Sequence, residues 1–293
     1  MKVISPNFFC IGAQKAGTTT LHDILKQHPE IFLPKRKEAH FFDLSDNYSN
    51  GIEWYYKRFF NNYSQEKMVG SCTPEYLFFP NTPHRIKKDL GSEVKFIVIL
   101  RNPIERAISH FNMSKSRGYE TYDFPEAINF ENIRINKNEF SLNHFSYINR
   151  GLYSIQLKRY FSIFDIKNFL ILNFEEDFIK NREETIQQIL SFLQVKKLNL
   201  KINIKSNESF HYKNKIAQNL RYNKPKFLKK IFQFIPENMR FVFNKKVHQL
   251  FSEPNYNKFN LSKTEKQILQ QRYFYNDIKE LESLTNKDFS NWL

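Results

Sequence analysis

The sequence has few of the residues that build disulfide frameworks or metal sites. Among 293 residues only two are cysteines, Cys10 and Cys72, and their positions lack metal-ligand spacing. The eight histidines are scattered, and no HExxH pair occurs. These absences exclude a small disulfide scaffold and a structural zinc motif. They predict a protein of a reducing compartment that holds no metal.

Long apolar runs are also absent. The N-terminal stretch MKVISPNFFCIGAQ lacks the apolar core, about 7–15 residues long, of a secretory leader. No run elsewhere approaches the roughly 18–20 residues that a membrane-spanning helix needs. We therefore expect a cytoplasmic protein.

Glycine is scarce in this chain, and acidic residues are fewer than basic ones. The chain has only seven glycines, and 16% of its residues are aromatic, which argues against disorder. Lys and Arg number 45 against 30 Asp and Glu, which gives a formal charge of +15. Such a field favours anionic partners, although a lysine- and asparagine-rich composition produces the same excess without one.

Alternating strand and helix patterns predict an α/β fold. Residues 8–12, 94–100 and 168–174 are short apolar runs typical of buried parallel strands. Apolar residues three and four apart follow them, as in Leu21, Ile24 and Leu25, and predict amphipathic helices. The pattern indicates a P-loop-like central parallel β-sheet flanked by helices on both faces.

The remaining segments predict additions to that core. Residues 120–148 have no clear period, and we expect an excursion there. Residues 211–251 carry ten Lys and Arg against one acid, Glu237. A final helix is expected at about 262–284. We predict a single domain, 1–293, with the basic helical part 211–293 packed on it.

The stretch GAQKAGTTT, between the first strand and the first helix, resembles a phosphate-binding loop. A loop that opens a helix presents backbone N–H groups and the positive end of the helix dipole to an anion. A Walker loop would need a lysine directly after Gly17, but Thr18 stands there, and the only lysine is Lys15. The loop is therefore expected to bind phosphate differently from a kinase loop.

The second strand ends on a cation. Nucleotide hydrolases often carry a magnesium-binding aspartate at such a strand end, whereas FIVIL is followed by Arg101. An arginine fork binds phosphate directly. Two such strand ends indicate a donor with phosphates at two places and no need for magnesium.

Three segments resemble the sulfotransferases that use 3′-phosphoadenosine-5′-phosphosulfate (PAPS). They are IGAQKAGTTTL, KEAHFFD and LRNPIERAISHF, in that order. RGLYSIQLKRYFSIF and the ending FSNWL also look like later family positions. The likeness is to the carbohydrate branch that includes the heparan sulfate enzymes, in a bacterial-type form.

The resemblance implies a donor site. Lys15 would contact the phosphosulfate bridge and offset charge on the leaving phosphate, and Arg101 and Ser109 would bind the 3′-phosphate. The residues implied to bind PAPS, and its product 3′-phosphoadenosine-5′-phosphate (PAP), are Lys15, Ala16, Gly17, Thr18, Thr19, Arg101, Ser109, Lys213 and Lys215. No metal is implied. Without the resemblance, the loop would be an ordinary strand-to-helix turn with a solvated lysine.

The resemblance also implies a catalytic segment. Glu38 would be the general base, and a carboxylate suits that task because it can accept the proton of an acceptor hydroxyl. His40 would assist it or bind the acceptor, and Asp43 would orient its neighbours. Lys35, Arg36 and Lys37 would draw an acidic acceptor toward the site. The plainer alternative is a charged loop followed by a buried pair of phenylalanines.

The sequence departs from the family in two places. Several heparan sulfate enzymes carry an acidic–Lys–Ser/Thr–Pro element, where this chain has Ser71, Cys72, Thr73 and Pro74. A second catalytic lysine is therefore missing there. The late basic loop that closes over the donor matches only loosely, and Lys213 and Lys215 are assigned to it on that basis.

Our leading interpretation is PAPS-dependent O-sulfation of a hydroxyl on a glycan or glycolipid, by direct in-line transfer. A small-molecule P-loop kinase is a second interpretation, and it would require magnesium. A third is a basic protein that grips nucleic acid or an anionic membrane through residues 211–251. With the enzyme interpretation we expect no nucleic-acid partner, and the basic segment offers a contact to the inner membrane face.

Overall fold

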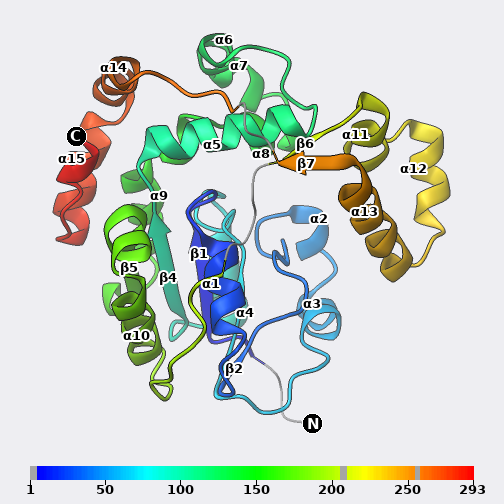
Figure 1. The fold of residues 1–293 in the computed structure, drawn as a ribbon. Helices are drawn as coiled ribbons and strands as arrows, with labels where there is room; N and C mark the ends of the chain where they lie inside the picture. Colours follow the sequence, from blue (N-terminus) through cyan, green and yellow to red (C-terminus); the bar gives the residue numbers. More distant parts are fainter. Residues whose placement is uncertain (1–4, 205–209, 255–257) are drawn as a thin grey trace. The chain divides into compact units, whose positions relative to one another are not determined.

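The structure, a computed structural model, describes residues 5–204, 210–254 and 258–293. The chain divides into two compact units and passes from one to the other after residues 106, 149, 206 and 262. The first unit holds the central sheet, and the second is mostly helical (Figure 1). The predicted single domain, 1–293, stays a prediction.

The central sheet has five parallel strands in the order β2-β3-β1-β4-β5. They are β1 (Phe8–Gly12), β2 (Ile31–Phe32), β3 (Met68–Cys72), β4 (Lys95–Leu100) and β5 (Phe169–Asn173). Every residue of β1 and β3 is buried, as expected of strands covered by other layers. Because the strands are parallel, their carboxyl ends meet at one edge, where α/β sheets bind ligands.

Helices flank this sheet, so the predicted fold class is confirmed (Figure 1). The first unit contains α1 (Thr18–Leu25), α2 (Ser45–Tyr48), α3 (Ile52–Phe59), α4 (Thr82–Leu90), α9 (Tyr153–Phe161), α10 (Arg182–Phe192), α14 (Lys263–Tyr273) and α15 (Tyr275–Thr285). It also contains two short 3-10 helices, η2 (Ile166–Asn168) and η4 (Ser290–Trp292), and the π-helix η3 (Phe174–Lys180).

The second unit is built from short helices and one small hairpin. It contains α6 (Phe124–Asn129), α7 (Glu131–Ile135), α8 (Glu139–Phe145), α11 (Lys215–Tyr222), α12 (Lys226–Gln233) and α13 (Glu237–Phe251), with strands β6 (Phe210–Tyr212) and β7 (Ser252–Pro254) paired antiparallel. Helix α5 (Pro103–Ser116) and the 3-10 helix η1 (Asn149–Gly151) run across the unit boundaries. The excursion predicted at 120–148 thus consists of three short helices.

One predicted element is wrong in its continuity. The helix expected at about 262–284 is two helices, α14 and α15, that meet at Phe274. The backbone leaves helical angles at Phe274 (φ −125°, ψ −12°), and its fully buried ring lies against Gly151. Burial of one large ring thus interrupts a run that is helical by periodicity alone.

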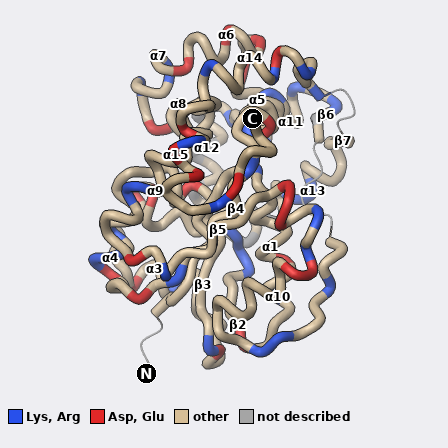
Figure 2. The backbone as a smooth tube through the Cα atoms, turned by 90° about the vertical axis from the view of Figure 1, so that its left-hand side faces the viewer, with Lys and Arg blue, Asp and Glu red and all other residues tan. Residues whose placement is uncertain are grey.

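The distribution of charged residues and, in the described part of the chain, the absence of a long apolar helix agree with the composition. Basic and acidic residues are spread along the whole tube rather than confined to one element (Figure 2). Within the described ranges, no helix combines the length and the hydropathy needed to cross a bilayer.

The β1–β3 pair depends on a glycine. A Cβ at Gly70 would lie 2.4 Å from the carbonyl oxygen of Phe8 and 2.5 Å from an atom of its ring. Backbone cannot withdraw from such a contact without moving the strand. Gly70 therefore lets the two central strands approach each other.

We expect Gly70→Ala to lower the free energy of unfolding by about 3 kcal/mol or more, because overpacking against backbone cannot be relieved by a rotamer change. Urea unfolding followed by circular dichroism measures this. The matched control is Gly51→Ala, where a Cβ meets nothing within 4 Å and only the backbone angles (φ 80°, ψ 162°) are strained, at a cost of about 1–3 kcal/mol. Equal losses in the two variants would contradict the close approach.

Candidate functional site

The loop between β1 and α1 turns sharply at Gly17. This residue is the N-cap of α1 and has φ 78°, in the left-handed region. A Cβ there would lie 2.9 Å from the rings of both Phe174 and Phe178. Only glycine satisfies both the angle and the space. The turn directs the start of α1 toward the carboxyl edge of the sheet.

The start of α1 has the features of an anion site. Lys15, Ala16, Gly17, Thr18 and Thr19, all predicted to bind the donor, form one turn and the first residues of the helix. No acidic side chain lies in this first turn. The first amides of a helix lack intrahelical acceptors, and the dipole adds positive potential. The arrangement can bind a phosphate group.

Arg101 joins this loop from the end of β4. Its Nη1 donates to the carbonyl oxygen of Lys15 at 3.0 Å, and its guanidinium lies 5.2 Å from the ring centre of Phe174. The carboxylates of Glu105 and Glu175 are each 4.0 Å from it. The structure therefore brings Arg101 and Lys15 together. The predicted contact of Arg101 with a 3′-phosphate stays a prediction.

Glu175 ties the end of the chain to this edge. It accepts from the backbone N–H of Asn102 at 3.2 Å and from Nε1 of Trp292 at 3.0 Å. Burial raises the pKa of Glu175, and these hydrogen bonds act in the opposite direction. The ending FSNWL thus supports the carboxylate that faces Arg101.

The segment predicted to be catalytic, residues 37–43, is attached by hydrogen bonds to the end of β3. The backbone N–H of Glu38 donates to the carbonyl of Cys72 at 3.2 Å, and that of Ala39 donates to Oγ1 of Thr73 at 3.2 Å. The buried hydroxyl of Tyr76 accepts from the backbone N–H groups of Phe41 and Phe42, at 3.3 and 3.4 Å. Backbone hydrogen bonds, rather than side-chain packing alone, therefore set the position of Glu38.

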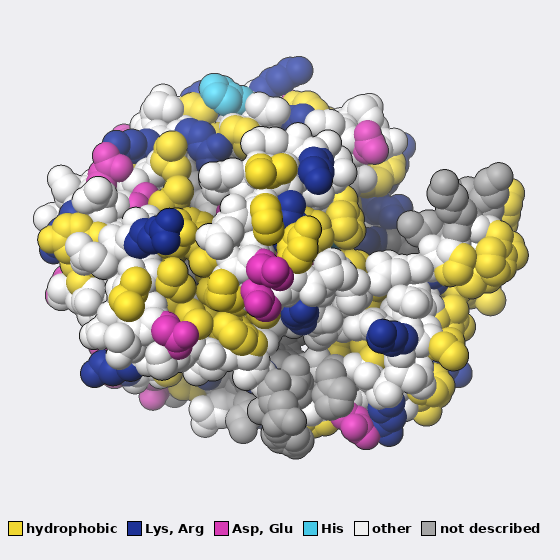
Figure 3. Space-filling model, turned by 90° about the horizontal axis from the view of Figure 1, so that it is seen from above, with side chains coloured by type: hydrophobic (Ala, Val, Ile, Leu, Met, Phe, Trp, Pro, Cys, Tyr) yellow, Lys and Arg dark blue, Asp and Glu magenta, His cyan; other side chains and the backbone are white. Residues whose placement is uncertain are grey.

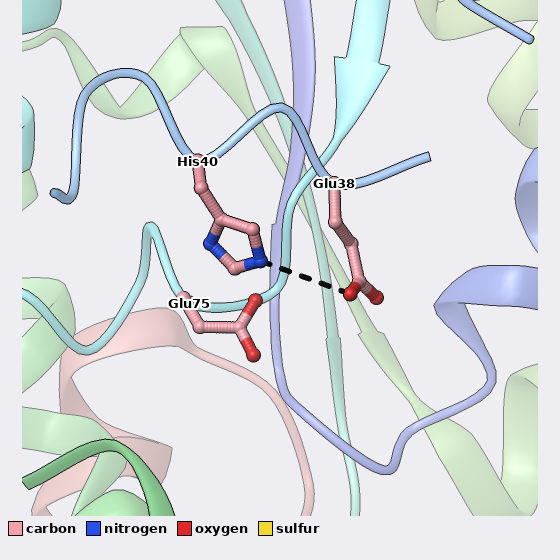
Figure 4. Close-up of side chains that lie close together, drawn as sticks. All are labelled: Glu38, His40 and Glu75. Atoms are coloured by element: carbon pink, nitrogen blue, oxygen red, sulfur yellow. Dashed lines mark ion pairs between the residues drawn. The ribbon is translucent and has the colours of Figure 1, made fainter. Parts of the chain in front are cut away.

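His40 lies among three carboxylates, those of Asp43, Glu38 and Glu75, of which Figure 4 shows the last two. Its Nδ1 donates to Asp43 at 2.7 Å, its Nε2 is 3.9 Å from Glu38, and an oxygen of Glu75 lies within 4.8 Å of ligating atoms of both His40 and Glu38. Burial lowers the pKa of His40, but the Asp43 hydrogen bond and the charges of Glu75, Asp43 and Glu38 outweigh it and raise the pKa to about 9. The imidazole is therefore a cation at neutral pH.

Three residues of this region have left-handed backbone angles. Lys15 has φ 72°, Glu38 has φ 67° and His40 has φ 47°. Such angles are costly for residues with a Cβ and tend to gather at functional sites. The surrounding hydrogen bonds hold these side chains in orientations that a relaxed loop would not give them.

Glu75 belongs to this site, and sequence reasoning missed it. It follows Thr73 by two residues in SCTPEY, and its buried carboxylate accepts from Nε2 of Gln14 at 3.1 Å. This hydrogen bond connects the loop between β1 and α1 to the carboxylates around His40. The only available signal was an acid directly after a Thr-Pro pair, at the end of a strand whose apolar run is interrupted by Gly70 and Ser71.

Lys37 differs from what its sequence neighbours indicate. Lys35 and Arg36 are exposed, as expected of charges that attract an acidic partner. The side chain of Lys37 is only 13% exposed and forms an ion pair with Glu38. Burial lowers the pKa of Lys37, but the charge and hydrogen bond of Glu38 outweigh burial and raise the pKa above its ordinary value, so Lys37 stays charged. The backbone hydrogen bond from the adjacent Glu38 to the carbonyl of Cys72 places this part of the chain near the position of the missing second lysine.

The cluster Glu38, His40 and Glu75 also has the spacing of a metal site. In this structure Lys37 pairs with Glu38, and a metal ion would have to displace that ammonium group and the proton of His40. The expected lack of a metal stays a prediction.

Three predicted residues lie in the second unit. Ser109 is on α5, Lys215 begins α11, and Lys213 forms an ion pair with Glu253 at 3.1 Å. Their position relative to Lys15 and Arg101 stays a prediction.

The fold and the strand-end loop define an α/β protein with a loop suited to a phosphate group at the carboxyl edge of its sheet. The profile of the sulfotransferase domain family matches residues 5–266, and the chain belongs to that family.

Individual relatives agree with the family. The chain is 33% identical over 172 residues to heparan sulfate glucosamine 3-O-sulfotransferase 5 of Mus musculus, which covers 57% of this chain and 47% of that protein. It is 40% identical over 111 residues to a membrane-associated sulfotransferase of Dictyostelium discoideum, covering 37% of this chain and 23% of the relative. The chain thus spans less than half the length of these curated relatives.

A solved structure matches along nearly its whole length. It is the sulfotransferase from Alicyclobacillus acidocaldarius, with a TM-score of 0.69, 26% identity and 99% of each chain covered. The predicted resemblance to sulfotransferases of the heparan sulfate branch is confirmed by these matches.

The raised pKa of His40 predicts that stability falls as pH rises. The folded protein holds this proton up to about pH 9, whereas the ordinary value is 6.5. The stabilisation is therefore complete below the ordinary pKa and is lost as pH rises through the folded pKa. Asp43→Asn removes one cause, so we expect a lower His40 pKa by NMR titration. We also expect a smaller fall in the free energy of unfolding from about pH 6 to about pH 9.5.

His40→Gln provides the matched control for that experiment. In a His40→Gln background, Asp43→Asn should leave the pH dependence unchanged, because the titrating group is gone. An unaltered His40 titration in the single variant Asp43→Asn would show that Asp43 does not hold the proton.

Proposed function

We propose that this protein transfers a sulfuryl group from PAPS to a hydroxyl of a carbohydrate acceptor, by direct in-line transfer. The observation that carries the proposal is the connection between two loops, in which Gln14 of the loop between β1 and α1 donates to Glu75 beside Glu38 and His40. Family membership supports the same reaction class.

The donor side of the proposal uses the loop and Arg101. The amides of Ala16, Gly17, Thr18 and Thr19 would hold the 5′-phosphosulfate at the start of α1. Arg101, together with Ser109, would bind the 3′-phosphate, and Lys213 and Lys215 would close over the nucleotide. PAPS supplies a sulfuryl group on a phosphate leaving group, and PAP is the product. No metal takes part.

The acceptor side uses Glu38. Its carboxylate would take the proton of the acceptor hydroxyl while the acceptor oxygen bonds to sulfur and the bond from sulfur to the bridging phosphate oxygen breaks. The leaving phosphate keeps the electron pair of that bond. Asp43 and Glu75 would keep His40 charged and oriented next to Glu38, where it can assist the base or contact the acceptor.

Lys37 offers a second cation for the leaving phosphate. Its ammonium pairs with Glu38 in this structure. When Glu38 becomes neutral by accepting the proton, the ammonium loses that counter-charge and can face the negative charge developing on the phosphate, beside Lys15. This role would compensate for the lysine that Cys72 replaces.

The acceptor is proposed from the relatives and from one cavity. The names of the matched mammalian enzymes specify heparan sulfate glucosamine, an acidic glycan. In the first unit, a cavity of about 370 Å³ has Lys26, Lys35, Arg36 and Arg58 among its lining residues, with Glu66 as its one acid. Lys35 and Arg36 directly precede the catalytic segment. An acidic glycan or glycolipid whose hydroxyl lies at Glu38 would extend over these cations.

The proposal also covers the cellular location of the protein and its domain organisation. Cys10 and Cys72 are buried and unpaired by disulfides, which suits the reducing cytoplasm. Contact with the inner membrane face through residues 211–251 would bring the enzyme near lipid-linked glycans. The chain would act as one sulfotransferase domain that does not bind nucleic acid.

The donor site predicts metal-free nucleotide binding. PAP titrated into the protein in EDTA, by calorimetry, should bind, and Arg101→Ala should weaken binding at least about 100-fold, since charged hydrogen bonds to phosphate are lost. ATP should compete only weakly. Lys88→Ala, which removes an exposed cation on α4, is the matched control and should bind PAP normally. A strict magnesium requirement with ATP preferred would favour a kinase.

Glu38→Gln tests the base. We expect the rate of transfer from radiolabelled PAPS to heparan sulfate to fall by about 10²–10⁴, because proton transfer is lost, while PAP affinity stays unchanged. Glu53→Gln on α3 removes an exposed acid and is the control. Full activity in Glu38→Gln would refute its role. Weaker PAP binding in that variant would instead point to a disturbed donor site.

A further inference from the structure

Helix α12 presents an apolar stripe to solvent. Phe227, Ile231 and Phe234, the last at the C-cap, are 63%, 55% and 87% exposed. Their spacing of four and three residues places them on one face of the helix. Monomeric proteins rarely expose contiguous large apolar side chains, and such patches mark interaction sites.

The opposite face of α12 already packs inside the second unit. Phe232 lies 5.3 Å from Phe243 of α13, ring centre to ring centre, and the ammonium of Lys224 lies 4.8 Å from the Phe232 ring. Phe243 in turn packs against the small core formed by Tyr212, Ala217 and Val247. The stripe is therefore separate from the side of α12 that packs in the core of the second unit.

Neighbouring helices of the second unit also expose large apolar side chains. Met239, Val242 and Leu250 of α13 are large apolar side chains that are also exposed. Ile216 of α11 is exposed as well. Hydrophobic side chains gather over α12 at the right-hand edge of the view in Figure 3.

The charge of this region is almost entirely positive. The sequence from 211 to 251 has ten Lys and Arg and one acid, Glu237. Lys215, Lys245 and Lys246 are exposed among the described side chains. The apolar stripe therefore lies within a strongly cationic segment.

We propose that the outer face of α12 inserts into the interface of an anionic membrane, with the surrounding lysines against the phosphate head groups. An interfacial helix has an apolar face that enters the boundary between head groups and acyl chains, and cations that remain in the head-group layer. Each cation near an anionic leaflet adds to the attraction. Charge complementarity thus selects an anionic lipid surface, since a zwitterionic one would leave the cations without partners.

This inference rests on the membrane contact included in the proposed function and names the helix face and the lipid class that make it; it is independent of the donor and acceptor sites. The full chain is sedimented with vesicles of phosphatidylcholine, with or without phosphatidylglycerol. We expect binding to the anionic vesicles only. Replacing two aromatic anchors, in Phe227→Ser with Phe234→Ser, should weaken that binding at least about 100-fold, because their burial in the acyl boundary is lost.

A double variant of other exposed isoleucines controls for general loss of apolar surface. Ile133→Ser with Ile155→Ser removes comparable exposed side chains from α7 and α9 and should bind vesicles as the wild type does. Circular dichroism of each variant reports correct folding without any ligand. Neither donor nor acceptor is needed for sedimentation, so a failed activity assay leaves this test intact.

Insertion is distinguished from surface adsorption by fluorescence. Phe234→Trp should show a blue shift on anionic vesicles beyond any change in the wild type, whose only tryptophans are Trp54 and Trp292. Equal binding to both vesicle types, or unchanged binding in the Phe227→Ser, Phe234→Ser variant, would overturn the proposal. So would a dimer held together by these residues, or a preference for a single-stranded oligonucleotide over the vesicles.

Discussion

The hydrogen bond from the backbone of Glu38 to the carbonyl of Cys72 is the constraint on which the candidate site depends. It attaches an irregular segment to the end of a buried strand, and Thr73 and Tyr76 continue the attachment along the next residues. A loop fixed through its backbone keeps its place whatever its side chains do. Chemistry can therefore reside on a segment that has no regular secondary structure of its own.

Two further contacts join the loops at the sheet edge. Gln14 reaches Glu75 from the end of β1, and Arg101 reaches the carbonyl of Lys15 from the end of β4. Strand ends supply positions fixed by the parallel register, so the contacts link rigid supports rather than mobile ones. The groups proposed to bind the donor and to accept the proton thereby share one framework, and a displacement of either loop would displace the other.

The local hydrophobic pattern of the sequence was sufficient to predict the elements that depend on it. The strands β1, β4 and β5 are apolar runs, and the fold class followed from their alternation with helices. Strand β2 has two residues and β3 contains Gly70 and Ser71, so neither gives a recognisable run. Burial of Lys37 and the arrival of Glu75 beside His40 arise from tertiary contacts between segments over 30 residues apart. A charge run in sequence cannot indicate which of its members is buried.

The left-handed angles of Lys15, Glu38 and His40 allow the cost of the backbone to be separated from the contribution of the side chain. Glycine at any of these positions would relieve backbone strain of about 1–2 kcal/mol. At Glu38 and His40 it would also remove the ion pairs with Lys37 and Asp43, so the gain from the backbone is opposed by the loss of side-chain contacts. Comparing the glycine variant with the alanine variant at one position therefore isolates the backbone strain, because both variants lack the side-chain contacts.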